Sequence, residues 1–441
     1  MKFINTLRDI FKIEELKDKI LLTIGLIAVY RFMAAVPLPG IDPLELSALK
    51  ASTEGGLLGL LNAFTGGAFA RASVMALGIM PYISASIVVQ LMGIAVPYLQ
   101  KLQKDGESGR KKITQITRWL TIGITLVQAP TYITAIKTSF GLPDAAFLVG
   151  DWTFVSSSII ILTAGTIFAM WLGERITDKG VGNGISLLIT VGIIANFPSA
   201  FLQEFLAKTN NSGAGGVMMI LIEIIVWLLV ILLTVLLVTA VRKIAVQYAR
   251  RTVVGNIQNV AGSRDYIPLK LNAAGVMPII FAQAIMFLPI ALAQRFPIIA
   301  GLQDINGLGY NLIFALLIVV FSFFYTAITI PTNKMAEDLK RSGGFIPGIR
   351  PGADTADRLD SVLSRITFPG SLFLAALSIL PAIAFQFGIK QSWAMFYGGT
   401  SLIIMVGVAI DTIQQINSYL LNRHYDGLMK PGNSNRKSEK K

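Results

Sequence analysis

Few side chains in this sequence could do chemistry. The chain has 441 residues, no cysteine and a single histidine, His424, which excludes disulfides, thiolate metal sites, cysteine nucleophiles and histidine proton relays. Two charges fall inside long apolar runs, Arg31 near the end of the first run and Glu223 about a third of the way into the sixth. Each costs a few kcal/mol against lipid, so we expect both to face protein or water.

The stretch GVGNGIS resembles a nucleotide-binding loop only in its glycines. It lacks the Gly-Lys-Ser/Thr ending of a phosphate-binding loop, and no strand precedes it. We interpret it as a tight turn between two helices, because glycine permits positive φ and close packing. No cofactor, metal or catalytic carboxylate pair is expected.

The elements that position these residues are expected to be membrane helices. Hydrophobic residues make up 54% of the chain and charged residues only 14%, whereas soluble domains carry about 25% charged residues. Apolar runs long enough to span a bilayer begin at ten places. These starts lie near Ile20, Ser73, Trp119, Trp152, Ile185, Val217, Ala273, Asn311, Phe368 and Trp393.

The basic residues predict the topology. With both termini inside, 31 of the 38 Lys and Arg lie in inside segments and six lie outside, a strong positive-inside bias. An outside loop around 201–216 separates five spans from five, which gives halves 1–200 and 201–425 of opposite orientation, as in inverted repeats. Loops 241–272 and 331–367 are long, basic and inside, and the basic tail 426–441 is expected to be disordered. The predicted fold class is therefore all-α, with ten transmembrane helices.

The uncharged stretch LLGLLNAFTGGAF, residues 57–69, fits neither a span nor an ordinary loop. A helix needs about twenty apolar residues to cross the bilayer core, so this run is too short. It is also too apolar to lie comfortably in water. Helix at membrane depth that does not face lipid is tolerated where protein or a cavity surrounds it.

Five motifs closely resemble the SecY family, the channel subunits of the bacterial protein-conducting translocon. They are ALGIMPYISASIVVQLM, GESGRKKITQITR, WLGERITDKGVGNGISLL, FFYTAITIPTNKMAEDLKRSGGFIPGIRPG and GGTSLIIMVGVAIDT. The resemblance runs in order over nearly the whole chain. It implies ten helices around an hourglass pore in the bacterial plasma membrane, with both termini cytoplasmic. The implied function is to pass unfolded preproteins and to release apolar segments sideways into the lipid bilayer.

The resemblance also implies site residues and partners. The short apolar stretch would be the plug, a re-entrant half-helix at about 55–72 that covers the pore constriction. The implied partners are the small membrane subunits SecE and SecG, the motor ATPase SecA, the ribosome and signal peptides. The implied residues are the pore ring Ile83, Ile87, Ile185, Ile189, Ile280 and Ile404, the plug residues Leu58, Leu61, Asn62, Phe64, Thr65 and Gly66, the lateral-gate residues Gln128 and Asn272, and the ribosome- and motor-docking residues Arg250, Arg251 and Arg350.

Two alternatives remain open at the level of residues alone. A secondary transporter with inverted repeats would need a midplane substrate site and several coupling charges, which Arg31 and Glu223 alone supply poorly. An intramembrane enzyme, such as a lipid-modifying transferase, would need clustered Asp, Glu or His near one interface. The sequence shows no such cluster.

Overall fold

The structure is a computed structural model of the full chain. It describes residues 13–42, 46, 59, 62, 64–138, 147–210, 216–248, 264–293, 304 and 306–429. Within these residues the fold is a bundle of long helices with one small sheet at one end.

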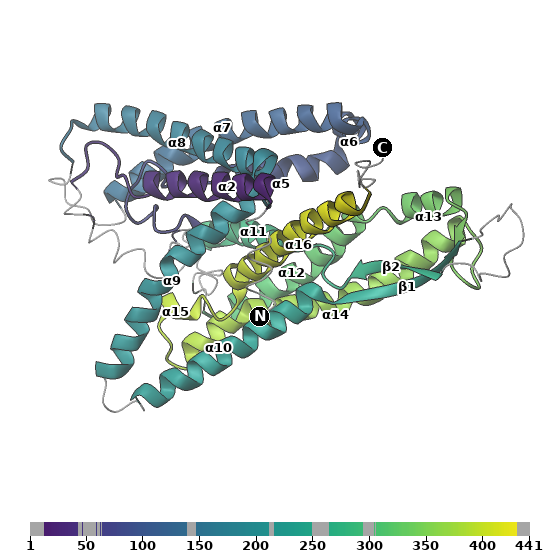
Figure 1. Cartoon of the computed structure of the whole chain (residues 1–441). Coiled ribbons are helices and arrows are strands. Elements are labelled where there is room, and N and C mark those ends of the chain that lie inside the picture. Colours follow the sequence, from purple (N-terminus) through teal and green to yellow (C-terminus); the bar gives the residue numbers. More distant parts are fainter. Residues whose placement is uncertain are drawn as a thin grey trace, which may run out of the picture.

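The first half of the chain forms one block of helices. It contains α2 (Glu14–Met33), α5 (Met80–Ala95), α6 (Pro97–Lys104), α7 (Gly106–Thr138), α8 (Asp151–Lys179) and α9 (Gly184–Asn210). Figure 1 shows α2, α7 and α8 lying side by side. The core between α7 and α8 includes the fully buried Ile133, Phe154 and Leu162, and α2 packs on α8 through a second core that contains Tyr30 and Leu172.

The second half forms another block with its own core. It contains α10 (Gly216–Thr239), α11 (Met277–Ala293), α12 (Leu308–Thr329), α13 (Thr332–Arg341), α14 (Ala353–Gln386), α15 (Gln391–Ala394) and α16 (Gly399–Met429). Ile279, Ile318 and Ile403 are fully buried in this core. Helix α9 lies between the blocks, because it packs on α8 of the first half and on α10, α15 and α16 of the second (Figure 1).

Most of the expected spans can be recognised in the structure. Among the described residues, seven helices are long and apolar enough to cross a membrane, and the bent pair α5 and α6 would make an eighth. Helices α2 and α11 lie at the two remaining expected positions. The arrangement is consistent with ten spans, and the number ten itself stays a prediction.

Several helix boundaries differ from those expected. Residues 73–79 are not helical, and α5 begins only at Met80. Helix α9 continues through most of the expected outside loop, to Asn210, and α16 continues to Met429, into the expected tail. Helix α14 begins at Ala353, well before the expected start. Apolar runs mark only the part of a helix that lies in lipid, so polar helix ends are missed.

The loop at 241–272, for which the sequence predicted only a long, basic segment on the inside, contains a β-hairpin. Strands β1 (Val241–Tyr248) and β2 (Arg264–Lys270) pair antiparallel, and β3 (Gly344–Phe345) from the second long loop joins the other edge of β1. Val246, Leu339, Ile346 and Leu359 form a small core beneath this sheet. The two long loops are therefore one structural unit, at the opposite end of the molecule from α15 (Figure 1).

Candidate functional site

Four of the six isoleucines expected in the ring meet in one apolar cluster. Ile189 on α9 and Ile404 on α16 are buried in it, and Ile83 on α5 and Ile185 on α9 pack against it. The spacing of Ile185 and Ile189 places both on one face of α9. Because α5 and α9 belong to the first half and α16 to the second, this cluster is an apolar contact between the halves.

The other two ring candidates do not join this cluster. Ile87 is buried one turn beyond Ile83 on α5, and Ile280 is half-buried on α11. The residue that does join it from this part of the chain is Val276, which packs against both this cluster and the core of the second half. Val276 lies one turn before Ile280, whose N–H donates to its carbonyl at 3.3 Å. No feature of residue type singled it out, because valine is common in membrane helices.

The expected plug lies directly against the isoleucine cluster. Of its six predicted residues, Leu58 and Leu61 lie outside the described residues. We call residues 64–72 the plug segment. Phe64 packs against the cluster that contains Ile189 and Ile404, and residues 65–70 are buried. The segment begins helical at Phe64 and continues in turns.

Side chains within the stretch replace the hydrogen bonds that a regular helix would supply. The Asn62 Oδ1 atom accepts from the Ala70 N–H at 3.0 Å, and the Thr65 hydroxyl accepts from the Phe69 N–H at 3.1 Å. Tyr132 on α7 donates to the Phe69 carbonyl at 2.8 Å. These bonds satisfy backbone groups that would be costly to leave unpaired at membrane depth. Non-helical backbone is thus tolerated here because protein encloses it.

The two predicted lateral-gate residues lie in different halves. Gln128 is half-buried on α7, and Asn272 is buried in the turn between β2 and α11. No hydrogen bond joins their side chains within the described part of the chain. The structure therefore shows no contact between Gln128 and Asn272 among the described residues, and their role in a lateral gate stays a prediction.

Of the three predicted docking arginines, only Arg350 is described, and Arg250 and Arg251 lie outside the described residues. Arg350 is exposed in the loop between β3 and α14. Its carbonyl accepts a hydrogen bond of 2.8 Å from the Thr355 hydroxyl, and the neighbouring Ile349 packs against the small core under the sheet. The backbone at Arg350 is thus anchored while its side chain faces solvent.

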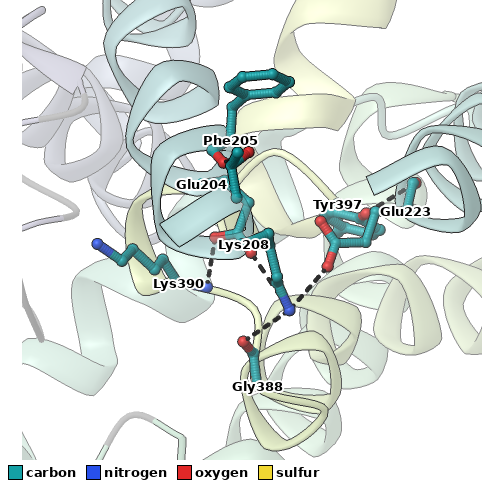
Figure 2. Close-up of polar contacts among 8 residues, drawn as sticks. Glu204, Phe205, Lys208, Glu223, Gly388, Lys390 and Tyr397 are labelled. Atoms are coloured by element: carbon teal, nitrogen blue, oxygen red, sulfur yellow. Dashed lines mark hydrogen bonds and ion pairs between the residues drawn. The ribbon is translucent and has the colours of Figure 1, made fainter. Parts of the chain in front are cut away.

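A buried charged cluster near the far end of α9 was not predicted. Figure 2 shows Lys208 on α9 between two carboxylates, with its Nζ 3.2 Å from Glu223 Oε1 on α10 and 3.6 Å from Glu204 Oε1 on α9. Lys208 Nζ also donates to the Gly388 carbonyl at 3.3 Å, and Glu204 Oε2 accepts from the backbone N–H of Lys390 at 2.9 Å. We call Glu204, Lys208 and Glu223 the Lys208 cluster.

The Lys208 cluster holds more acid than base. Its two carboxylates share one ammonium, and apart from their ion pairs with Lys208, both oxygens of Glu223 and the Oε1 atom of Glu204 are buried with no further polar partner among the described residues. Glu223 was expected to face protein or water, and the structure buries it against protein. Sequence analysis placed Lys208 among the outside charges and passed over Glu204, because both were assigned to a loop rather than to α9.

Aromatic side chains surround the same end of α9. Phe197 lies 5.4 Å from the ring of Trp227 on α10 and 5.4 Å from that of Trp393 on α15, measured between ring centroids. Phe201 lies 5.3 Å from Trp393, and the Trp227 indole donates to the Phe396 carbonyl at 2.9 Å. Aromatic pairs with this spacing stabilise a fold beyond the contribution of the apolar area that they bury. The outer turns of α9 are therefore built into the second half of the molecule.

The fold and this site define a polytopic helical membrane protein with an apolar contact between two halves and a buried segment against it. The described residues contain no group of three or more His, Cys, Asp or Glu placed to hold a metal ion.

Comparison with known proteins identifies the family. The family model described as SecY matches residues 73–413. The protein translocase subunit SecY of Streptomyces coelicolor is 40% identical over 436 residues, which cover 95% of this chain and 98% of that relative. The chain therefore belongs to the SecY family and is a protein-conducting channel subunit rather than an enzyme.

Solved channels share the fold. One structure, described as showing that the plug domain of SecY stabilises the closed state and maintains a membrane seal, matches with a TM-score of 0.62 and 18% identity over 94% of each chain. Sec61 from a canine ribosome–channel complex of the endoplasmic reticulum matches with a TM-score of 0.56 and 18% identity over 94% of each chain. At 18% sequence identity, this similarity shows that the chain shares the fold of these channels.

Proposed function

We propose that the isoleucine cluster is the constriction through which unfolded secretory chains pass. The supporting observation is that Ile83, Ile185, Ile189 and Ile404 come from three helices and both halves yet pack together. A narrow apolar ring sheds water and so resists ions. It also offers no specific hydrogen bonds, so it can surround a chain of any sequence without binding it. Separation of the halves would open it.

The plug segment closes this constriction in the resting state. Phe64 packs on the cluster, and the turns that follow it are buried, which supports the role. The related channel described as sealed by its plug domain supports it as well. The plug segment is short and rich in turns, so a passing chain can displace it without unfolding the long helices.

The proposed channel function also assigns roles to residues outside the constriction. Gln128 and Asn272 would line a lateral exit through which apolar segments reach the lipid bilayer. The channel would lie in a bacterial plasma membrane with both termini cytoplasmic, as the basic loops favour. The sheet end would then face the cytoplasm, where Arg350 on its anchored loop would dock the ribosome or the motor ATPase SecA. SecE and SecG would be bound as small subunits, and signal peptides would open the exit.

A coupled transporter is not favoured, because the two charges that fall inside long apolar runs both have partners within the protein. Arg31 donates to the Gly66 carbonyl, and Glu223 pairs with Lys208. Neither is left to carry an ion or a substrate.

Disulfide cross-linking tests the proposed path. Because the chain has no cysteine, Ile404→Cys and Leu232→Cys each carry one unique thiol. Leu232 on α10 is 61% exposed on the outer surface of the bundle and serves as the control. A secretory chain with one cysteine is stalled during translocation and oxidised. We expect a cross-link to Cys at 404 and none at 232. Equal cross-linking at both positions, or at 232 only, would contradict the proposed path.

A further inference from the structure

Arg31 contacts the plug segment from α2. It lies in the last turn of that helix, half-buried, and its Nη1 donates a hydrogen bond of 3.0 Å to the carbonyl oxygen of Gly66. A charged donor makes a stronger hydrogen bond than a neutral one. None of the ion pairs among the described residues involves Arg31. Its main polar contact is therefore with the plug segment and not with a carboxylate.

The Gly66 backbone lies between Arg31 and α9. Gly66 has φ of +66°, and a Cβ atom there would overlap Arg31 Nη1 and lie 2.8 Å from the Gly192 Cα atom. A Cβ atom on Gly192 would in turn lie 2.8 Å from the Phe64 carbonyl oxygen. Glycine at both positions lets the two backbones approach closely. The guanidinium therefore holds this turn against the face of α9 that carries Ile189.

The Gly66 carbonyl needs a donor from outside its own segment. The neighbouring N–H groups are used within the segment, since the Gly67 N–H donates to the Asn62 carbonyl at 2.9 Å and the Ala68 N–H donates to the Thr65 carbonyl at 3.4 Å. A buried carbonyl left unpaired is costly. Arg31 supplies the hydrogen-bond donor that this carbonyl needs. In return, the carbonyl gives the Arg31 guanidinium a polar partner in an apolar region.

We propose that Arg31 is a positioning residue that holds the plug segment over the isoleucine cluster. The proposal rests on the proposed function, since it assumes that the plug segment moves. When a passing chain displaces the plug segment, the Gly66 carbonyl moves away from Arg31. The guanidinium then faces the water in the open pore, which hydrates its charge. The hydrogen bond between Arg31 and the Gly66 carbonyl favours the closed state. Because water can solvate both groups once this bond breaks, the plug segment can leave and return.

Thiol labelling in the resting channel tests this role. Ala68→Cys places a thiol in the plug segment at a site that is fully buried, and Leu148→Cys, at a site 70% exposed, gives the maximum labelling rate. In the Ala68→Cys background, we expect Arg31→Gln to raise the rate of labelling by a membrane-impermeant reagent about tenfold, equal to about 1.4 kcal/mol in the opening equilibrium. Arg31→Lys keeps the charge but loses the forked donors, and we expect an intermediate rate.

The matched control is Arg71→Gln, which removes an exposed arginine from the same segment. We expect it to label at the unmodified rate. A wild-type rate in Arg31→Gln overturns the proposal, and so does an equal increase in Arg71→Gln. If only Arg31→Lys accumulates in the membrane, a wild-type rate in that variant overturns it too.

A second arm separates this proposal from the proposed function. The Ala68→Cys protein with wild-type Arg31 is labelled while a stalled chain occupies the pore. Increased labelling supports a mobile plug segment, and the Arg31 variants then test the positioning role by itself. Unchanged labelling during translocation would contradict the proposed plug, whatever the Arg31 variants do at rest.

Discussion

Helix α9 contacts the rest of the molecule at two places that differ in construction. At its far end, Lys208 is held by Glu204, Glu223 and the Gly388 carbonyl, and an aromatic group surrounds that end. In its middle, at Gly192, it meets the plug segment through close backbone packing, and on its other side the same turn of the segment accepts a hydrogen bond from Arg31 on α2. The first contact joins side chains of two helices with each other and with the backbone of a loop, and the second joins one side chain to one carbonyl.

This difference separates a fixed contact from one that can be released. Breaking the Lys208 cluster would leave carboxylates buried without a cation, which is strongly unfavourable. Breaking the Arg31 contact leaves a carbonyl and a guanidinium that water can solvate. We infer that α9 stays attached to the second half at its far end while the contacts near its middle open and close.

The largest effect is expected at the fixed contact. Lys208→Met removes the cation shared by two buried carboxylates, and we expect a loss of about 3–5 kcal/mol in the free energy of unfolding. The measurement is equilibrium unfolding in mixed detergent micelles titrated with sodium dodecyl sulfate.

Lys137→Met is the matched control for this variant. Lys137 pairs with Asp151 at 2.7 Å, but the carboxylate is 88% exposed, so the loss is expected to stay within about 1 kcal/mol. Similar losses in Lys208→Met and Lys137→Met would remove the basis for treating the Lys208 cluster as a fixed contact.

A smaller effect is expected where the halves must separate. Ile404→Asn puts an amide into the apolar cluster, which wets the constriction and lowers the barrier to opening. We expect export of a reporter with a defective signal sequence to rise about tenfold, while a reporter with an intact signal is exported at the normal rate. Leu402→Asn, at a buried site in the core of the second half, is the control. A loss of all export in Ile404→Asn, with normal accumulation, would count against the ring assignment.

The smallest effect is expected from removing the excess acid. Glu223→Gln leaves one carboxylate, that of Glu204, paired with Lys208, so its unfolding free energy is expected to stay within about 1 kcal/mol of wild type. Combined with Lys208→Met, the same change should recover part of the stability lost by Lys208→Met alone, because neighbouring charges are not additive. A double variant as unstable as the sum of the two single variants would mean that Glu223 and Lys208 are not coupled.

Sequence reasoning predicted the parts of this structure that repeat a simple pattern. Long apolar runs predicted the helices, and the family resemblance predicted four isoleucines that the structure brings together from distant parts of the chain. Arg31 and Glu223 were recognised as charges that must face protein or water, because exposing them to lipid is costly. Their partners could not be predicted, since a backbone carbonyl such as that of Gly66 has no signature in the sequence.

The misses have physical reasons. Glu204 and Lys208 were assigned to a loop because polar residues ended the apolar run, although α9 continues to Asn210. The β-hairpin was missed because a basic, polar loop shows little alternation of apolar and polar residues, and β3 joins it from a loop about a hundred residues later in the chain. Val276 was missed because packing, not residue type, selects it over Ile280.

The central claim is that the isoleucine cluster and the plug segment together seal the resting channel, and single-channel conductance tests it most directly. A variant that lacks residues 62–70 is placed in a planar bilayer without substrate, beside wild type and Leu148→Ala. The long helices carry the packing, so the deletion variant should fold and support export, with the cluster as its only seal. We predict brief ion currents from the deletion variant and silence from the other two. A folded, export-competent deletion variant as silent as wild type would contradict the account.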